Sequence, residues 1–199
     1  MSLKKYQENK NNPQSEYFYY PMFKRWLKRR MRGTGKNHRI MFCGKFHPHE
    51  FDIIGGYEHK RIRKFTLFSI EVKMRDFFAT FQQAHLRKIF FDYCYVAFPM
   101  TFFSSVLQDF MKNYLLLQEK GIGCLFYDDL RNRVFCGLKA KLKSKSPLYP
   151  HKQYHWEIVK LLWNLEEKEE ETRDPGQLSL DEFLDSISNK KGDVNHATQ

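Results

Sequence analysis

Two neighbouring stretches decide the fold: HEFDIIGG at residues 49–56 and KFTLFSIEVKM at residues 64–74. Both read as strands, and because the link between them is short, antiparallel pairing is the simplest arrangement. Side chains alternate between the two faces of a strand, so residues 66, 68, 70 and 72 share a mostly apolar face suited to a core. The opposite face ends with Glu71 and Lys73. The pattern predicts a sheet with a carboxylate and a lysine side by side at one strand end.

Asp52 opens the first of these strands, so pairing of the two strands would place it beside Glu71. Two nearby carboxylates repel each other and hold a divalent cation such as Mg²⁺. A metal polarises a phosphate and lowers the pKa of bound water, while an ammonium such as that of Lys73 stabilises developing negative charge. Glu-x-Lys by itself is usually a solvated surface pair. The preceding Asp, the following helix and the basic composition favour phosphodiester hydrolysis.

The other elements follow from periodicity and from Gly and Pro punctuation. Residues 1–14 are expected to form a flexible arm, and strand links carry His-Pro-His or Gly-Gly. Antiparallel strands come first and βαβ-like crossovers follow, which predicts an α/β fold with a mixed sheet flanked by helices. The expected helices are 15–32, 75–91, 104–120 and 152–171, and the expected strands are 38–46, 51–57, 64–73, 92–98, 123–127 and 133–139.

The order and spacing of these residues resemble the PD-(D/E)XK nuclease superfamily. Asp52 matches the first acid of its motif, and Glu71-Val72-Lys73 matches the second acid and the lysine. Glu16 falls where many members carry a glutamate on the first helix, and QQAHLRKIFFDYCYVAFP at residues 82–99 is similar to the helix and buried strand that follow. Phe51 stands where the family often has Pro. The resemblance covers roughly residues 15–140 and implies a restriction-endonuclease-like αβββαβ core.

The same resemblance implies roles for these residues. Asp52 and Glu71 would bind Mg²⁺ or Mn²⁺, Glu16 would assist directly or through water, and Lys73 would position the nucleophile. Gln82 or Gln83 would touch the scissile phosphate or orient Lys73, although the pattern favours reading each as an ordinary surface residue of a helix. The Holliday-junction-resolvase and archaeal viral branches of the superfamily are similar in size and typically dimeric, so a homodimer is expected.

Charge is divided unevenly along the 199 residues. Residues 1–150 carry 28 Lys and Arg against 12 Asp and Glu, a net +16, whereas residues 151–199 carry 6 against 11, a net −5. A basic body indicates a polyanionic partner such as DNA, whose backbone phosphates are contacted without reading sequence. A lysine-protected edge strand would give part of the same pattern. The candidate DNA-binding residues are Lys28, Arg29, Arg30, Arg32, Lys36, Arg131, Arg133, Lys139 and Lys141.

Several other chemistries find little support. His47-Pro48-His49 lacks a third ligand with zinc spacing, although His49 is near enough to Asp52 in the chain to reach its site. The four cysteines are far apart and form no CxxC pair, and no apolar run is long enough to cross a membrane. An intracellular, cytoplasmic protein is expected.

The C-terminal residues 173–199 read as an acidic, polar tail after a domain at residues 15–172. Within it, QLSLDEFL at residues 177–184 resembles the sliding-clamp binding peptide of archaeal and eukaryotic replication proteins. On one helical turn its apolar side chains would form an apolar surface that fits a groove, although docking onto the protein's own domain or onto a dimer partner is the competing interpretation. The residues of this motif are Gln177, Leu180, Phe183 and Leu184.

The sequence thus predicts a divalent-metal-dependent DNA endonuclease that selects branched or junction DNA by structure. A DNA-binding protein that kept the fold without cleaving is the main alternative. Convergence of Asp52, Glu71 and Lys73 around open space would separate the two.

Overall fold

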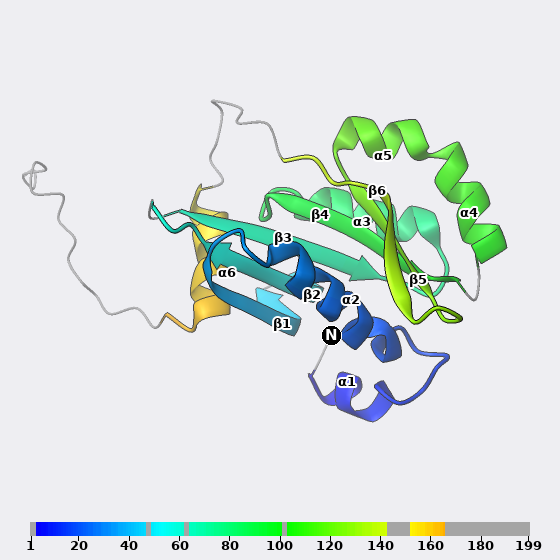
Figure 1. The fold of residues 1–199 in the computed structure, drawn as a ribbon, viewed down its shortest axis with the longest axis horizontal. Coiled ribbons are helices and arrows are strands. Elements are labelled where there is room, and N and C mark those ends of the chain that lie inside the picture. The colour runs from blue at the N-terminus through cyan, green and yellow to red at the C-terminus, as the bar shows by residue number, and fades with distance from the viewer. Residues whose placement is uncertain (1–2, 47–48, 62–63, 101–102, 143–151, 166–199) are drawn as a thin grey trace, which may run out of the picture. The chain divides into compact units, whose positions relative to one another are not determined.

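A six-stranded mixed sheet forms the centre of the computed structural model, with its strands in the order β1-β2-β3-β4-β5-β6 (Figure 1). The structure describes residues 3–46, 49–61, 64–100, 103–142 and 152–165. The strands are β1 (Lys36–Phe46), β2 (His49–Glu58), β3 (Phe65–Val72), β4 (Tyr93–Pro99), β5 (Gly123–Asp128) and β6 (Arg133–Leu138). The helices are α1 (Leu3–Asn9), α2 (Glu16–Met31), α3 (Phe77–Arg87), α4 (Phe103–Lys112), α5 (Tyr114–Lys120) and α6 (Lys152–Trp163).

Pairing follows the expected pattern. β1, β2 and β3 form an antiparallel meander, β3, β4 and β5 run parallel, and β6 returns antiparallel to β5. The parallel steps are made by crossovers that contain helices, as parallel neighbours require. The prediction of a mixed α/β sheet flanked by helices is therefore confirmed.

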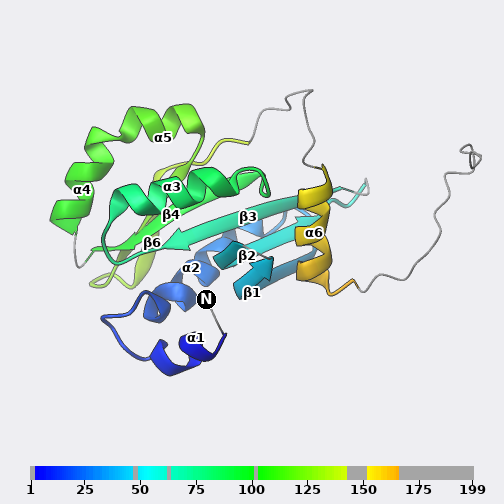
Figure 2. The same ribbon diagram turned by 180° about the vertical axis from the view of Figure 1, so that it is seen from behind.

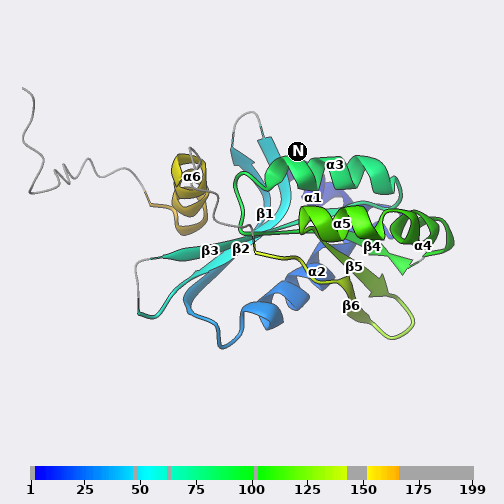
Figure 3. The ribbon, with the colours of Figure 1, turned by 90° about the horizontal axis from the view of Figure 1, so that it is seen from above.

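Both faces of the sheet are buried. Figure 3 shows α2 on one side and α3 to α5 on the other, and Figure 2 shows α3 to α5 from that second side. Phe23 and Leu27 of α2 pack with Phe68 and Ile70 of β3, whereas Leu67 of β3 packs with α6 on the opposite face. The alternating side chains of β3 were expected to bury one face of the strand. Because helices cover both sides of the sheet, both faces of β3 are buried.

The N-terminal segment departs from the prediction of a flexible arm. Residues 3–9 form α1, and the ring of Tyr6 lies 5.9 Å from that of Tyr20 and 5.2 Å from that of Phe42. The segment is mostly polar, but the single aromatic ring of Tyr6 is enough to pack this short helix against α2 and β1.

The helix expected at residues 104–120 is two helices. Asn113 separates α4 from α5, and its side-chain amide donates to the carbonyl of Asp109 at 2.8 Å. Asparagine competes for backbone groups in this way and so interrupts helices. Likewise, α3 begins after Asp76, whose side chain accepts from Ala79 N, and ends at Arg87.

The Gly55-Gly56 pair lies inside β2 and is not a link between strands. A Cβ on Gly55 would lie 2.9 Å from Leu27 of α2, and one on Gly56 would lie 3.1 Å from Trp163 of α6. The two glycines therefore allow helices to approach β2 from both sides. This close approach brings α2, with Glu16 at its start, against the strands that carry Asp52 and Glu71.

Candidate active site

The β2–β3 pairing brings Asp52 and Glu71 together. Ile53 pairs with Ile70, so the preceding residue of β2 and the following residue of β3 are neighbours. Asp52 Oδ2 accepts a hydrogen bond of 2.8 Å from the backbone N–H of Val72, which holds its carboxylate at the end of β3. Both acids are only 2% exposed, so their charge requires compensation.

Lys73 supplies part of that compensation. Its backbone N–H donates to the carbonyl of Ala97, which fixes the chain directly after β3 to β4. Its Nζ lies 3.1 Å from Glu16 Oε2, 3.9 Å from Asp52 Oδ2 and 3.9 Å from Glu71 Oε1. One ammonium thus faces carboxylates from α2, β2 and β3, which are far apart in sequence.

Glu16 reaches this cluster because it is the first residue of α2. Ser15 caps the helix through its side chain, which accepts from Tyr17 N, and an acid in the first turn is favoured by the helix dipole. Burial and repulsion from Asp52 raise the pKa of Glu16, outweighing the opposite pull of Lys73. Glu16 therefore holds a proton more readily than an ordinary glutamate.

Lys73 keeps its charge. Burial by itself would lower the pKa of Lys73, but the attraction of Asp52 and Glu16 outweighs burial and raises it. The ammonium remains protonated throughout the physiological range.

Two further residues of the cluster, Tyr20 and Arg87, were not predicted from the sequence. Burial, Asp52 and Glu16 raise the pKa of Tyr20, so its fully buried phenol stays protonated and hydrogen-bonds to Asp52. Arg87 at the end of α3 forms an ion pair with Glu71, donates to the carbonyl of Glu50, and lies over the ring of Phe51 at 5.3 Å. Burial lowers the pKa of Arg87. Only the helical spacing of four from Gln83 could have indicated Arg87 in advance.

A depression of about 370 Å³ opens onto these groups and is lined by His49, Glu50, Asp52, Glu71, Lys73, Gln83 and Arg87. The structure thus brings Asp52, Glu71, Lys73 and Gln83 to one depression, with Glu16 in contact with Lys73. His49 reaches the site, as its position near Asp52 in the chain suggested. Gln82 is exposed and is not among the lining residues.

Carboxylates of Glu16, Asp52 and Glu71 meet at this cluster, and carboxylate oxygens are the ligands that Mg²⁺ and Mn²⁺ prefer. Within the described residues, no three or more His, Cys, Asp and Glu side chains are grouped so as to hold an ion directly. Lys73 lies near all three carboxylates and Arg87 pairs with Glu71, so two positive charges offset part of three negative ones. Asp52 and Glu71, with Glu16, are the residues that would hold the metal.

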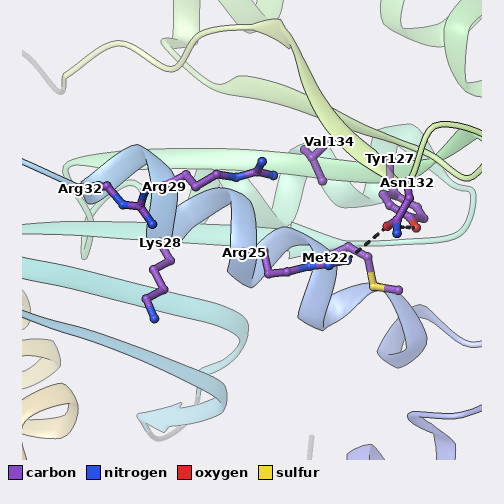
Figure 4. Close-up of a pocket in the computed structure, with 8 residues that line it drawn as sticks. All are labelled: Met22, Arg25, Lys28, Arg29, Arg32, Tyr127, Asn132 and Val134. Atoms are coloured by element: carbon purple, nitrogen blue, oxygen red, sulfur yellow. Dashed lines mark hydrogen bonds between the residues drawn. The ribbon is translucent and has the colours of Figure 1, made fainter.

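The candidate DNA-binding residues do not form one surface. Lys28, Arg29 and Arg32 line a second depression between α2 and the β5–β6 hairpin, together with Arg25 (Figure 4). Lys36 pairs with Glu58. Arg131 pairs with Asp128 of the hairpin turn.

The remaining candidates lie elsewhere. Arg30 hydrogen-bonds to Tyr95, and Arg133 is exposed at the start of β6. Lys139 is exposed after β6, and Lys141 lines a further depression beside Lys88 and Lys120. The tail at 173–199 and its clamp-like motif lie outside the described residues. No helix of the described chain combines the length and the apolarity that a membrane crossing demands.

Comparison with known proteins adds no relative to this picture: no protein-family model, curated protein or solved structure matches the chain.

Proposed function

We propose that this protein is a divalent-metal-dependent DNA endonuclease with a restriction-endonuclease-like core. The main observation in support is that the Nζ of Lys73 lies within 4 Å of carboxylate oxygens from Glu16, Asp52 and Glu71. The element order α2-β1-β2-β3-α3-β4 supports the proposal, because it is the αβββαβ order that the resemblance to PD-(D/E)XK nucleases implies.

Each residue has a role that follows from its surroundings. Asp52 and Glu71 would hold Mg²⁺ or Mn²⁺ with help from Glu16, and the ion would polarise the phosphate and acidify its bound water. Lys73 stabilises negative charge on the phosphate oxygens, since it retains its proton. Glu16, whose pKa is raised, is a better proton acceptor than an ordinary carboxylate and would take the proton of the attacking water.

Tyr20 and Arg87 act through their neighbours. Tyr20 orients Asp52 by its hydrogen bond, and Arg87 orients Glu71 by its ion pair. Gln83 lines the same depression and would contact the substrate backbone.

A DNA-binding protein without nuclease activity is the second candidate, and one observation favours it. Asp52 and Glu71 each already have a cationic neighbour, Lys73 or Arg87, so these two carboxylates are paired within the protein itself. In that case the charged groups would be a structural network and DNA would be bound without cleavage.

Structure-selective cleavage of branched DNA, homodimer formation, a cytoplasmic location and clamp binding through residues 177–184 remain parts of the proposal that rest on sequence. The basic character of residues 1–150 supports a DNA partner.

The test is cleavage of labelled duplex, single-stranded and four-way-junction DNA in Mg²⁺, in Mn²⁺ and in EDTA. The wild type is compared with Glu71→Gln and Lys73→Ala, each expected to lower the cleavage rate by at least about 10²-fold, as for other groups that stabilise transition-state charge. A circular substrate distinguishes endonuclease from exonuclease, because it has no ends.

Glu119→Gln and Lys112→Ala are the matched controls, since both alter exposed charges on α5 and α4. They are expected to cut as the wild type does. Tight binding of all three DNAs without cutting in either metal would overturn the nuclease proposal in favour of the binding protein.

A further inference from the structure

A second site lies between α2 and the β5–β6 hairpin. It is a depression of about 310 Å³ lined by Met22, Arg25, Lys28, Arg29, Arg32, Tyr127, Asn132 and Val134. Four of these described lining residues are cations and none is an acid. Such a concentration of positive charge around a hollow fits the phosphates of a nucleic-acid backbone.

The site is held by a fixed polar network. Arg25 Nη2 donates to Asn132 Oδ1 at 3.2 Å, and Tyr127 Oη donates to the same oxygen at 3.0 Å. Figure 4 shows Arg25 extending toward Asn132 and Arg29 extending toward Val134, so guanidinium groups of α2 face the hairpin. Asn132 has a positive φ of 46°, which asparagine tolerates well. The hairpin and the helix are therefore tied together without a ligand.

The tip of the same hairpin carries Leu130, which is 99% exposed. It is two residues from Asn132 in the chain, which places their Cα atoms within about 7 Å of each other. Asp128 fixes the turn: its carboxylate accepts from the backbone N–H of Arg131 at 3.1 Å and pairs with the Arg131 guanidinium. Leu130 is thus fully exposed on a turn that Asp128 holds, beside a hollow lined by arginines. Proteins that unstack bases insert an apolar side chain of this kind between them.

The position of the depression relative to the carboxylate cluster is set by α2. Glu16 begins the helix at the cluster, and Arg25 and Arg29 follow nine and thirteen residues later. At 1.5 Å per residue, they lie about 14 and 20 Å along the helix axis. For a duplex that runs parallel to α2, this length corresponds to about four to six base pairs.

We propose that the depression between α2 and the β5–β6 hairpin binds the DNA backbone, about 14 to 20 Å along α2 from the carboxylate cluster, while Leu130 inserts into the base stack there. This inference rests on the proposed DNA substrate but not on cleavage. It gives structure selectivity a physical basis, because junctions and mispaired duplexes unstack at lower cost than a continuous duplex.

The test measures binding in EDTA, where no cleavage occurs. The probes are a four-way junction and a continuous duplex, each carrying 2-aminopurine, whose fluorescence rises when its base unstacks. The wild type is expected to bind the junction more tightly than the duplex and to raise its fluorescence.

Leu130→Ala is expected to abolish the fluorescence rise and to weaken junction binding about tenfold, with duplex binding changed less than threefold, because an inserted apolar side chain acts only at an opened step. Arg29→Gln with Arg32→Gln is expected to weaken both complexes and to lower the salt slope of log K by about two, one for each lost phosphate contact. Leu115→Ala, which alters a leucine on α5 that is 76% exposed, is the matched control and should bind as the wild type does.

An unchanged fluorescence rise in Leu130→Ala would overturn the wedge, and an unchanged salt slope in the double arginine variant would overturn the backbone grip. Tighter binding to an RNA duplex of the same sequence would overturn DNA as the source of the phosphates. Failure of the nuclease proposal is distinguishable, because it would leave these binding results intact while no substrate is cut.

Discussion

At the scale of single residues, the cluster around Lys73 is a group of charges that depend on one another. Glu16, Asp52 and Glu71 are held close together, and two basic side chains offset their repulsion. The raised pKa of Glu16 shows that burial and Asp52 outweigh the attraction of Lys73. The ionised form of Glu16 therefore lowers the free energy of unfolding. Such unfavourable grouping of charges is typical of sites that bind a ligand.

The pH dependence of Glu16→Gln follows from this imbalance. A carboxyl whose folded pKa is raised contributes stability below its ordinary pKa of 4.5 and loses it as the pH rises through the raised value. The free energy of unfolding of Glu16→Gln, measured relative to that of the wild type, should therefore increase as the pH rises from 4 to 8. Urea unfolding of both proteins at several pH values measures the difference.

Glu119→Gln serves as the control for that series. Lys120 lowers the pKa of this exposed carboxylate, so its replacement should act in the opposite direction. A gap between wild type and Glu16→Gln that stays constant with pH would contradict the electrostatic account of the cluster.

At the scale of elements, α2 connects the two candidate sites and its position depends on β2. Its buried face carries Tyr20, Phe23 and Leu27, and Leu27 approaches the backbone of β2 at Gly55. Only a residue without a side chain allows this contact, since a Cβ at that position would also lie 3.0 Å from the carbonyl of Arg39. The sequence marks Gly55-Gly56 as special, but the reason is helix packing and not a turn.

Gly55→Ala should therefore destabilise the protein by about 1–3 kcal/mol, the usual cost of overpacking a filled core. The added methyl group would push α2 away from β2 and move Glu16 relative to Lys73. Denaturant unfolding gives the stability change. Met111→Ala, on an exposed part of α4, is the control and should change stability by less than about 0.5 kcal/mol. Unaltered stability of Gly55→Ala would mean that α2 adjusts without cost.

At the scale of the whole molecule, residues 1–150 carry a net charge of +16, while three carboxylates gather at Lys73. A basic protein attracts polyanions over a long range, whereas a local group of carboxylates attracts a divalent cation. The fold provides both by placing the acids at one end of β2 and β3 and the arginines farther along α2.

Metal binding should therefore stabilise the folded protein. At a metal concentration 100-fold above Kd, the gain is about 2.7 kcal/mol, which for a domain of this size raises Tm by roughly 5–10 °C. Thermal unfolding with Mn²⁺, with Mg²⁺ and with EDTA measures the shift. Asp52→Asn should remove it and Glu119→Gln should keep it. An equal shift in Asp52→Asn would place the metal elsewhere.

The amino-acid pattern was enough to predict a mixed α/β sheet, the antiparallel pairing of its first strands, and the meeting of Asp52, Glu71 and Lys73. These features depend on local patterns: the period of two in a strand, short links, and the antiparallel register that places one strand's start beside the next strand's end. Glu16 was also anticipated, through the resemblance and not through periodicity.

The other residues of the cluster became evident from the packing of the helices against the sheet. Tyr20 and Arg87 have ordinary helical surroundings in the sequence, and their contacts with Asp52 and Glu71 arise because α2 and α3 pack against the sheet. The same holds for the hollow between α2 and the β5–β6 hairpin, where Arg25 meets Asn132 across 107 positions of the chain. Packing between distant elements depends on the shape of both surfaces together, and no local pattern encodes it.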